Sequence, residues 1–254
     1  MNSNDTIFAI DIGNTNLHWC YINNGKIKGE YKRNKHSEIS HLPWNEIKKT
    51  NFPIVIAGTL NQSSKQLEQI KRKYNLNFIE LNTKNQRLIK NIYPALGIDR
   101  VCALTAASRI LPTSNSPIIV FDFGTATTIT CCDSDRNFLG GLIHTGIKLE
   151  LDSLSSQTVS LPKIDPSEGE KINKLNPLAN NTKDAILHGT ILGQIALCEN
   201  FITSLEKETK LESKIVLTGG NANIINKFFK RKIDLFDQYL TIKGLYYLHE
   251  ASLQ

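Results

Sequence analysis

The sequence predicts an α/β protein built from two related domains, and the main observation is a repeated strand-and-loop pattern. Two short, wholly apolar runs, residues 7–10 and 118–121, lead into Asp-x-Gly at Asp11 and Asp122. Apolar runs of this length are typical of strands buried in a sheet. With the second run aligned at an offset of 111 residues, four pairs are identical: Ile7/Ile118, Asp11/Asp122, Gly13/Gly124 and Cys20/Cys131.

A second repeated pair supports the duplication and locates an insertion. Residues 54–58 and 215–220 are again apolar runs that end in glycine, and their offset has grown to 161 residues. The second half therefore holds about 50 additional residues, which we expect as a helical insertion at about 139–213. The predicted domains are 1–115 and 116–254.

Local patterns fit this plan. Residues 14–28 surround Asn23-Asn24-Gly25, a strong hairpin signal. An Ala- and Leu-rich helix is predicted over 101–111, where Pro112 stops it. A helix is expected after residues 54–58, extending to Tyr74, and another after residues 215–220, extending to Lys232. A further helix is expected over 149–154.

The insertion should contain one main helix. Residues 182–205 carry apolar side chains at helical spacing, with Thr182 placed as N-cap and Asp184 in the first turn. Thr182 could therefore serve the helix alone, without any role in a binding site.

Composition excludes several classes of protein. The chain of 254 residues is 40% hydrophobic with a net charge of +6, unlike a disordered, collagen-like or coiled-coil chain. Its five cysteines form no C-x-x-C pair, so neither a disulfide framework nor a zinc site is indicated. With no signal peptide, no membrane-length apolar run and no nucleic-acid motif, we expect a cytoplasmic protein with neither membrane nor nucleic-acid partners.

The two Asp-x-Gly loops could together bind a nucleotide. A strand that ends in Asp-x-Gly places a carboxylate and a tight turn at the carboxyl end of a sheet, where ligands bind in α/β folds. Glycine lets the backbone approach phosphate oxygens, and the carboxylate can hold a cation that neutralises them. A single copy would most simply be an ordinary turn. Two copies, with Gly219-Gly220 offering open space for adenine or ribose, point to ATP.

A longer set of motifs runs in order along the chain: Asp11-Ile12-Gly13-Asn14-Thr15-Asn16, Leu96-Gly97-Ile98-Asp99-Arg100, Asp122-Phe123-Gly124-Thr125-Ala126, Gly140-Gly141 and Asn181-Thr182-x-x-Ala185-Ile186. In this order and spacing the set resembles one family, the type III pantothenate kinases, which lies within the superfamily of acetate and sugar kinases, heat-shock ATPases and actin. The resemblance implies duplicated ribonuclease-H-like domains with the active site in the cleft between them. It also implies ATP-dependent phosphorylation of pantothenate to 4'-phosphopantothenate, the first step of coenzyme A biosynthesis.

The resemblance implies a role for each matching residue. Asp99 would accept the proton of the substrate hydroxyl, and Asp122 would coordinate a monovalent cation, K⁺ or NH₄⁺, while Mg²⁺ accompanies ATP. Read without the family, Asp99 could be a helix N-cap and Arg100 a surface ion pair. The implied ATP-binding residues are Asp11, Ile12, Gly13, Asn14, Thr15, Asn16, Leu17, His18 and Thr125; the implied substrate-binding residues are Tyr93, Gly97, Ile98, Asp99, Arg100 and Thr182, with Thr182 acting across a homodimer interface.

Three departures from the family pattern bear on activity. His18 stands where the family usually has Lys or Arg, so its side chain could contact ATP or could be an exposed strand residue. Thr145 replaces the usual proline before Gly146, which should loosen that turn. Tyr93 lies closer to Gly97 than the substrate-facing aromatic residue usually does.

Two other functions remain open from the sequence. A phosphatase of the same superfamily would act on polyphosphate or a nucleotide, with water in place of the alcohol. A non-catalytic regulator could have kept the fold, which the changes at His18 and Thr145 make conceivable. ADP release that depends on pantothenate would separate the kinase from the phosphatase, and loss of ATP and pantothenate binding would favour the regulator.

Overall fold

A computed structural model describes residues 5–13, 15–58 and 60–253, with the side chains of 60–62 excepted. Contacts within the chain divide it into two compact units: unit 1 is Met1–Ile110 with Tyr239–Gln254, and unit 2 is Leu111–Gln238. The expected boundaries, 1–115 and 116–254, differ from these units because the C-terminal segment packs with the first.

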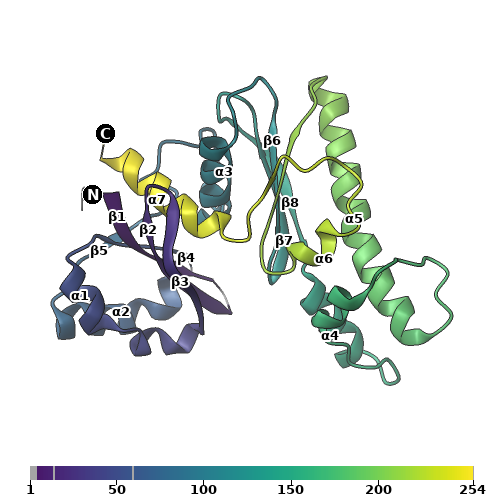
Figure 1. Ribbon diagram of the computed structural model, residues 1–254, viewed down its shortest axis with the longest axis horizontal. Coiled ribbons are helices and arrows are strands. Elements are labelled where there is room, and N and C mark those ends of the chain that lie inside the picture. Colours follow the sequence, from purple (N-terminus) through teal and green to yellow (C-terminus); the bar gives the residue numbers. More distant parts are fainter. Residues whose placement is uncertain (1–4, 14, 59, 254) are drawn as a thin grey trace. The chain divides into compact units, whose positions relative to one another are not determined.

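Unit 1 is built on a five-stranded mixed sheet (Figure 1). The central strand β1 runs antiparallel to β2 and parallel to β4, and the outer strands are β3 and β5. The order is β3-β2-β1-β4-β5, with bounds Thr6–Ile12 for β1, Asn16–Asn23 for β2, Lys26–Lys35 for β3, Ile54–Gly58 for β4 and Phe78–Glu80 for β5.

The predicted hairpin is confirmed as β2 and β3. Its two loop residues, Asn24 and Gly25, have φ angles of 48° and 69°. Positive φ at both positions matches the type I′ turn, whose twist suits the flanking strands. This turn therefore sets the register in which β3 pairs with β2.

Helices cover both faces of the unit 1 sheet. Alternate residues of β1 pack in one core cluster with α1 (Trp44–Thr50) and α2 (Leu60–Tyr74), while α7 (Leu240–Ser252) contacts β1 and β4 and packs along α3 (Ile98–Ile110). The predicted helix over 101–111 is thus confirmed as α3, beginning three residues earlier. A short 3-10 helix, η2 (His36–His41), follows β3.

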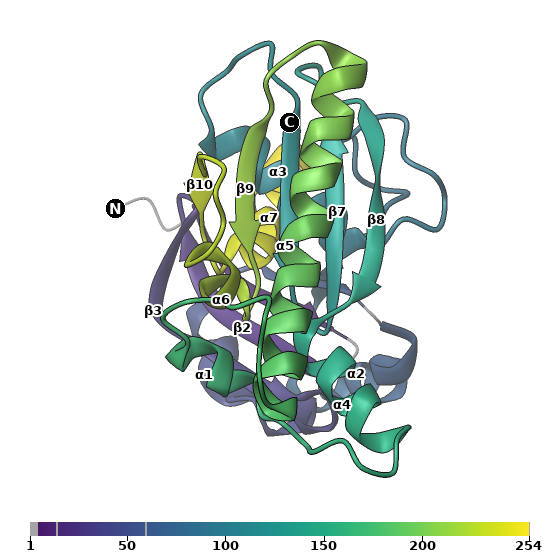
Figure 2. The same ribbon diagram turned by 90° about the vertical axis from the view of Figure 1, so that its right-hand side faces the viewer.

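Unit 2 repeats this sheet, which confirms the duplication (Figure 2). Its register agrees with both offsets, since Phe8 lies opposite Ile54 and Ile119 lies opposite Ile215. Strand directions also match. The order is β8-β7-β6-β9-β10, with bounds Ile118–Phe123 for β6, Ala126–Cys132 for β7, Phe138–Thr145 for β8, Lys214–Thr218 for β9 and Leu235–Phe236 for β10.

The offset of 111 residues between the two repeats changes at the loop that follows β1 and β6. One pair of residues expected to be equivalent, Cys20 and Cys131, is therefore corrected. The Gly13 N–H donates to the Asn16 carbonyl at 2.9 Å, whereas the Gly124 N–H donates to the carbonyl of Ala126 at 3.1 Å. The second loop is therefore one residue shorter. As a result Cys20, opposite Ala9, corresponds to Thr130, opposite Val120, and its identity with Cys131 is not a structural equivalence.

The additional residues of unit 2 follow β8, which is the counterpart of β3. They form α4 (Ile147–Ser156), the 3-10 helix η3 (Pro166–Lys171) and the long helix α5 (Thr182–Thr209). The predicted helices at 149–154 and 182–205 are confirmed. The expected N-cap was wrong by one residue, because the Asn181 side chain accepts the Asp184 N–H at 2.9 Å.

The expected helix to Lys232 is much shorter. Only α6 (Ala222–Asn226) forms after β9, and turns around Phe228 and Phe229 lead towards β10. Phe229 packs edge-on against Phe121 at a ring-centroid distance of 6.1 Å. Aromatic packing against the sheet therefore replaces the helical turns that the pattern predicted.

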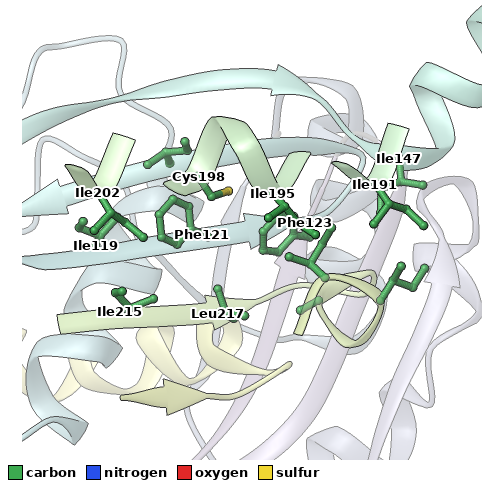
Figure 3. Packing of buried hydrophobic residues seen from close by; sticks show 14 of the residues in the cluster. Ile119, Phe121, Phe123, Ile147, Ile191, Ile195, Cys198, Ile202, Ile215 and Leu217 are labelled. Carbon is green, nitrogen blue, oxygen red and sulfur yellow. The ribbon is translucent and has the colours of Figure 1, made fainter. Parts of the chain in front are cut away.

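The core of unit 2 lies between its sheet and α5 (Figure 3). Ile191, Ile195, Cys198 and Ile202 of α5 belong to one cluster with apolar residues of β6 and β9. By length and composition α5 would also pass for a membrane-spanning helix, the one such helix among the described residues, with 44% of its most apolar window buried. Its buried side serves the core of a two-layer α/β unit.

Candidate active site

The loop that begins at Asp11 lies at the carboxyl end of β1, and we name it the first phosphate loop after the role expected for it; the loop that begins at Asp122 is the second. Asp11 is the penultimate residue of that strand, and Gly13 lies so close to the Asn16 carbonyl that an added Cβ would be 3.0 Å from it. Ile12 and Leu17 are fully buried, so only their backbone could meet a ligand. Thr15 is exposed and Asn16 half-buried, whereas Asn14 lies outside the described residues.

His18 is held beside Asp11. Its Nδ1 lies 3.8 Å from Asp11 Oδ2, and its ring stacks on Tyr31 with centroids 5.4 Å apart and an interplanar angle of 18°. Tyr31 in turn contacts Tyr239 at 4.4 Å. The ring is partly exposed, and it carries a positive charge towards Asp11 only when protonated.

The Gly-x-Asp-Arg motif forms the start of α3, with Asp99 in the first turn. A Cβ on Gly97 would fall 2.3 Å from Asp99 Oδ1, so glycine is required for this position of the carboxylate. Ile98 at the start of the helix is buried. Asp99 follows the first helical residue, so it is not the N-cap that the alternative interpretation expected.

The Asp99 carboxyl is suited to accept a proton. Although the residue is exposed at the surface, protein atoms crowd its carboxyl, and this burial raises its pKa above the usual value. The negative charge of Asp11 raises the pKa further, against smaller lowering effects from backbone N–H groups and Arg100. A carboxyl with a raised pKa is a stronger base when ionised.

Arg100 and Tyr93 form a second part of this cluster. Arg100 is 5% exposed, and its Nη1 donates to the Tyr93 hydroxyl at 3.1 Å. Burial excludes the surface ion pair that was the alternative for Arg100. Tyr93 itself is 44% exposed, so part of its side chain is accessible from solvent.

The second phosphate loop, in unit 2, follows β6. Asp122 is half-buried at the end of that strand, and a Cβ on Gly219, whose φ is 94°, would fall 2.4 Å from Asp122 Oδ1. Gly219 therefore makes room for the carboxylate. Thr218 lies opposite Asp122 in the sheet, and its buried hydroxyl has no hydrogen-bond partner within the described residues.

Two segments fix the backbone of this loop. The Gly146 N–H donates to the Thr125 carbonyl at 3.1 Å, and a Cβ on Gly146 would lie 2.4 Å from the carbonyl oxygens of both Gly124 and Thr125. The Asn221 N–H donates to the Phe123 carbonyl at 3.0 Å. Sequence reasoning did not identify Asn221 as part of the site, although its position two residues after a strand-ending glycine was a signal.

Thr182 lies apart from that loop, at the start of α5. It lines a shallow surface groove of about 580 Å³ with Asn181, Ala185 and Ile186 among its neighbours. Thr182 is exposed, and Asn181 already caps the helix, so the Thr182 hydroxyl is not needed as a cap.

Solved structures define the class to which this fold belongs. The chain resembles the ethanolamine utilization protein EutJ from Carboxydothermus hydrogenoformans, with a TM-score of 0.55, 13% identity and coverage of 96% of this chain and 89% of that one. It also resembles the ADPNP-bound activator of 2-hydroxyisocaproyl-CoA dehydratase from Clostridium difficile, with a TM-score of 0.54, 15% identity and coverage of 98% and 96%. An archaeal actin homologue, Ta0583, gives a TM-score of 0.52 at 10% identity, covering 98% and 100%. The fold is that of actin-like ATPases with duplicated ribonuclease-H-like domains, as predicted.

Sequence comparison identifies the family within this class. The family model of type III pantothenate kinases matches residues 7–204. The type III pantothenate kinase of Sulfurihydrogenibium sp. (strain YO3AOP1) is 31% identical over 258 residues, covering 95% of this chain and 98% of that protein. The chain belongs to the type III pantothenate kinase family.

Proposed function

We propose that this chain transfers the terminal phosphoryl group of ATP to the terminal hydroxyl of pantothenate. The product is 4'-phosphopantothenate, and the reaction is the first step of coenzyme A biosynthesis. Family membership supports this assignment, and the observation that carries the mechanism is the Asp99 carboxyl, whose pKa is raised by burial and by Asp11.

Asp99 is the proposed catalytic base. Phosphoryl transfer depends on positioning, on neutralisation of phosphate charge and on a base near the attacking hydroxyl. Gly97 leaves the space that Asp99 Oδ1 occupies, and the first turn of α3 holds the residue in place. As the hydroxyl oxygen bonds to phosphorus, its proton passes to the Asp99 carboxylate, and the bond to ADP breaks.

We assign both phosphate loops to ATP. The residues from Asp11 to His18 supply backbone N–H groups and polar side chains at the end of β1. Thr125 supplies its backbone N–H and its hydroxyl after the end of β6. Mg²⁺ bound with ATP neutralises phosphate charge. The Asp122 carboxylate and the Thr218 hydroxyl opposite it in the sheet offer oxygen atoms, which suit a monovalent cation, K⁺ or NH₄⁺.

The pantothenate carboxylate is matched to Arg100. A guanidinium offers a fixed fork of donors to a carboxylate, and it stays ionised when buried. Tyr93, bonded to Arg100, and the backbone of Gly97 and Ile98 would complete this part of the substrate site. Thr182, in its groove on α5, would contact pantothenate across the homodimer interface.

A homodimer in the cytoplasm is part of the proposal. Among the described residues β8 pairs only with β7, and it exposes apolar side chains at Leu139, Leu142 and Ile143. An exposed apolar edge strand is a surface that proteins usually cover. Sedimentation equilibrium should give twice the chain mass, and Ile143→Lys should shift the protein towards monomer.

The deciding experiment couples ADP release to a spectrophotometric signal, with ATP, Mg²⁺ and K⁺ present. We expect ADP only when pantothenate is added. Asp99→Asn should fold normally and lose about 10²- to 10⁴-fold in kcat, the usual contribution of a positioned base. Asp135→Asn, an exposed carboxylate in a turn of unit 2, is the matched control and should keep full activity.

Other outcomes would reject parts of this proposal. ADP release without pantothenate would indicate the phosphatase. Calorimetry with neither ATP nor pantothenate binding would indicate the regulator. Wild-type turnover by Asp99→Asn would remove Asp99 as the base while leaving the activity assigned.

A further inference from the structure

A buried amide on α5 contacts the segment that supports the second phosphate loop. Gln194 is 1% exposed, and its Nε2 donates to the Thr145 carbonyl at 2.8 Å and to Glu150 Oε2 at 3.4 Å. The same nitrogen lies 3.2 Å from His144 Nδ1. Helix α5 is thereby tied to the end of β8 and to α4.

The orientation of this amide follows from its partners. A carbonyl and a carboxylate oxygen only accept hydrogen bonds, so the NH₂ group of Gln194 must face them. Its Oε1 then points away, and it has no hydrogen-bond partner among the described residues. A buried acceptor without a partner costs free energy, so this orientation is maintained by the bonds that the NH₂ group makes.

The next residue links this contact to the loop. Gly146 follows Thr145 directly, its N–H donates to the Thr125 carbonyl at 3.1 Å, and its Cα packs against the Gly124 and Thr125 carbonyls too closely for any side chain. Ile147, after Gly146, is buried in the cluster that includes Ile191 and Ile195 (Figure 3). Gln194 lies between those two isoleucines in sequence, on the helix that packs there.

We propose that Gln194 is a positioning residue for ATP, which fixes Thr145 so that Gly146 holds the loop at Thr125 in its binding conformation. It acts through the backbone and does not touch the nucleotide. The inference rests on the proposed role of Thr125 in ATP binding. It also explains how the chain accommodates Thr145 where the family usually has proline. The hydrogen bond from the Gln194 side chain to the Thr145 carbonyl restrains the turn that proline would otherwise stiffen.

The effect on folding should be small. In Gln194→Met the Thr145 carbonyl keeps the His144 ring as a neighbour at 3.0 Å, and Glu150 keeps its bond from the Thr190 hydroxyl at 3.1 Å. Met has nearly the shape of Gln, and it also removes the buried Oε1. A loss of function in this variant would therefore reflect loop geometry and not unfolding.

The test combines ATP binding with amide hydrogen exchange in the full chain. For Gln194→Met we expect the dissociation constant for ATP, from calorimetry without pantothenate, to rise about five-fold, as expected for one hydrogen bond. The Gly146 N–H should exchange faster, and kcat at saturating ATP should change less than two-fold. The matched control is Gln157→Met at the exposed end of α4. A second control, Thr190→Val, removes the hydrogen bond from Thr190 to Glu150 and leaves the hydrogen bond from Gln194 to the Thr145 carbonyl intact.

The outcomes distinguish this inference from the proposed function. Equal ATP affinity and equal Gly146 exchange in Gln194→Met and Gln157→Met would overturn it, as would an equal loss in Thr190→Val. If Gln194→Met does not fold, Gln194→Leu is measured with the same criteria. If the wild-type protein binds ATP without phosphorylating pantothenate, the proposed function fails, while the effect of Gln194 on ATP binding is still measured.

Discussion

At the scale of single residues, the candidate site contains two carboxylates that influence each other. Asp99 and Asp11 come from α3 and β1, and the charge of Asp11 disfavours ionisation of Asp99. Burial acts in the same direction. The pKa of Asp99 is therefore raised, although the helix N-terminus alone would lower it.

This arrangement predicts a pH dependence. Asp99 can accept a proton only when ionised, so kcat should fall as the pH drops through the raised pKa, at a higher pH than an ordinary aspartate would give. Asp11→Asn removes a negative charge, which lowers the pKa of Asp99 and moves the acid limb to lower pH. Carboxyl ¹³C NMR of Asp99 in both proteins measures this shift directly. An unchanged Asp99 titration in Asp11→Asn would contradict the coupling.

At the scale of secondary structure, the duplication placed comparable carboxylates at equivalent strand ends. Gly58 and Gly219 are also equivalent, with φ angles of 116° and 94°, and each lies against the end of the neighbouring central strand. The two loops differ by one residue, and only the second has a long helical insertion behind it. The repeated element is therefore the strand end, and the parts around it differ.

Helix packing in unit 1 gives a prediction at this scale. A Cβ on Gly244 of α7 would lie 2.1 Å from the Cys102 carbonyl of α3, so the two helices approach backbone to backbone. Gly244→Ala should destabilise the protein by about 1–3 kcal/mol, as overpacking does. Gly193→Ala, at a helical glycine with open space around it, should instead stabilise by about 0.5–1 kcal/mol. Denaturant unfolding compares the two, and equal midpoints would refute the close approach.

At the scale of the whole molecule, charge is divided unevenly. Unit 1 holds 17 Lys+Arg against 9 Asp+Glu, and unit 2 holds 13 against 15. The net charge of +6 is thus +8 on unit 1 and −2 on unit 2. A positive unit raises the local concentration of anionic substrates, and salt screens that attraction.

We therefore expect kcat/KM for pantothenate, at saturating ATP, to fall several-fold as ionic strength rises. Between about 0.1 M and about 1 M salt the screening length drops from about 10 Å to about 3 Å. Tetramethylammonium chloride at fixed K⁺ is suitable, because it raises the ionic strength without changing the K⁺ concentration. A neutral amide of pantothenate is the control, and an equally steep slope for that amide would contradict attraction by charge.

Much of the fold and many of the candidate residues followed from local pattern. Apolar runs that lead into Asp-x-Gly predicted β1 and β6, and those that end in glycine predicted β4 and β9. Asn24-Gly25 predicted the hairpin. These signals could be found in the sequence because they depend on neighbouring residues. The predicted helix to Lys232 was wrong because Phe229 packs on Phe121, a contact over a hundred residues apart in sequence. The Cys20/Cys131 pair was wrong because a one-residue change in loop length shifts a strand register without altering the apolar pattern.

The sequence by itself determined the duplicated α/β architecture and the family, and it supplied the candidate for the base, since strand periodicity and motif order are properties of the chain. Tertiary structure alone decided that α7 completes unit 1, that Arg100 is buried against Tyr93, and that Gln194 reaches the segment before Gly146. The physical reason is that burial, pKa and hydrogen bonding depend on atoms brought together from distant parts of the chain. Residue order specifies which atoms are available, and only packing sets their distances.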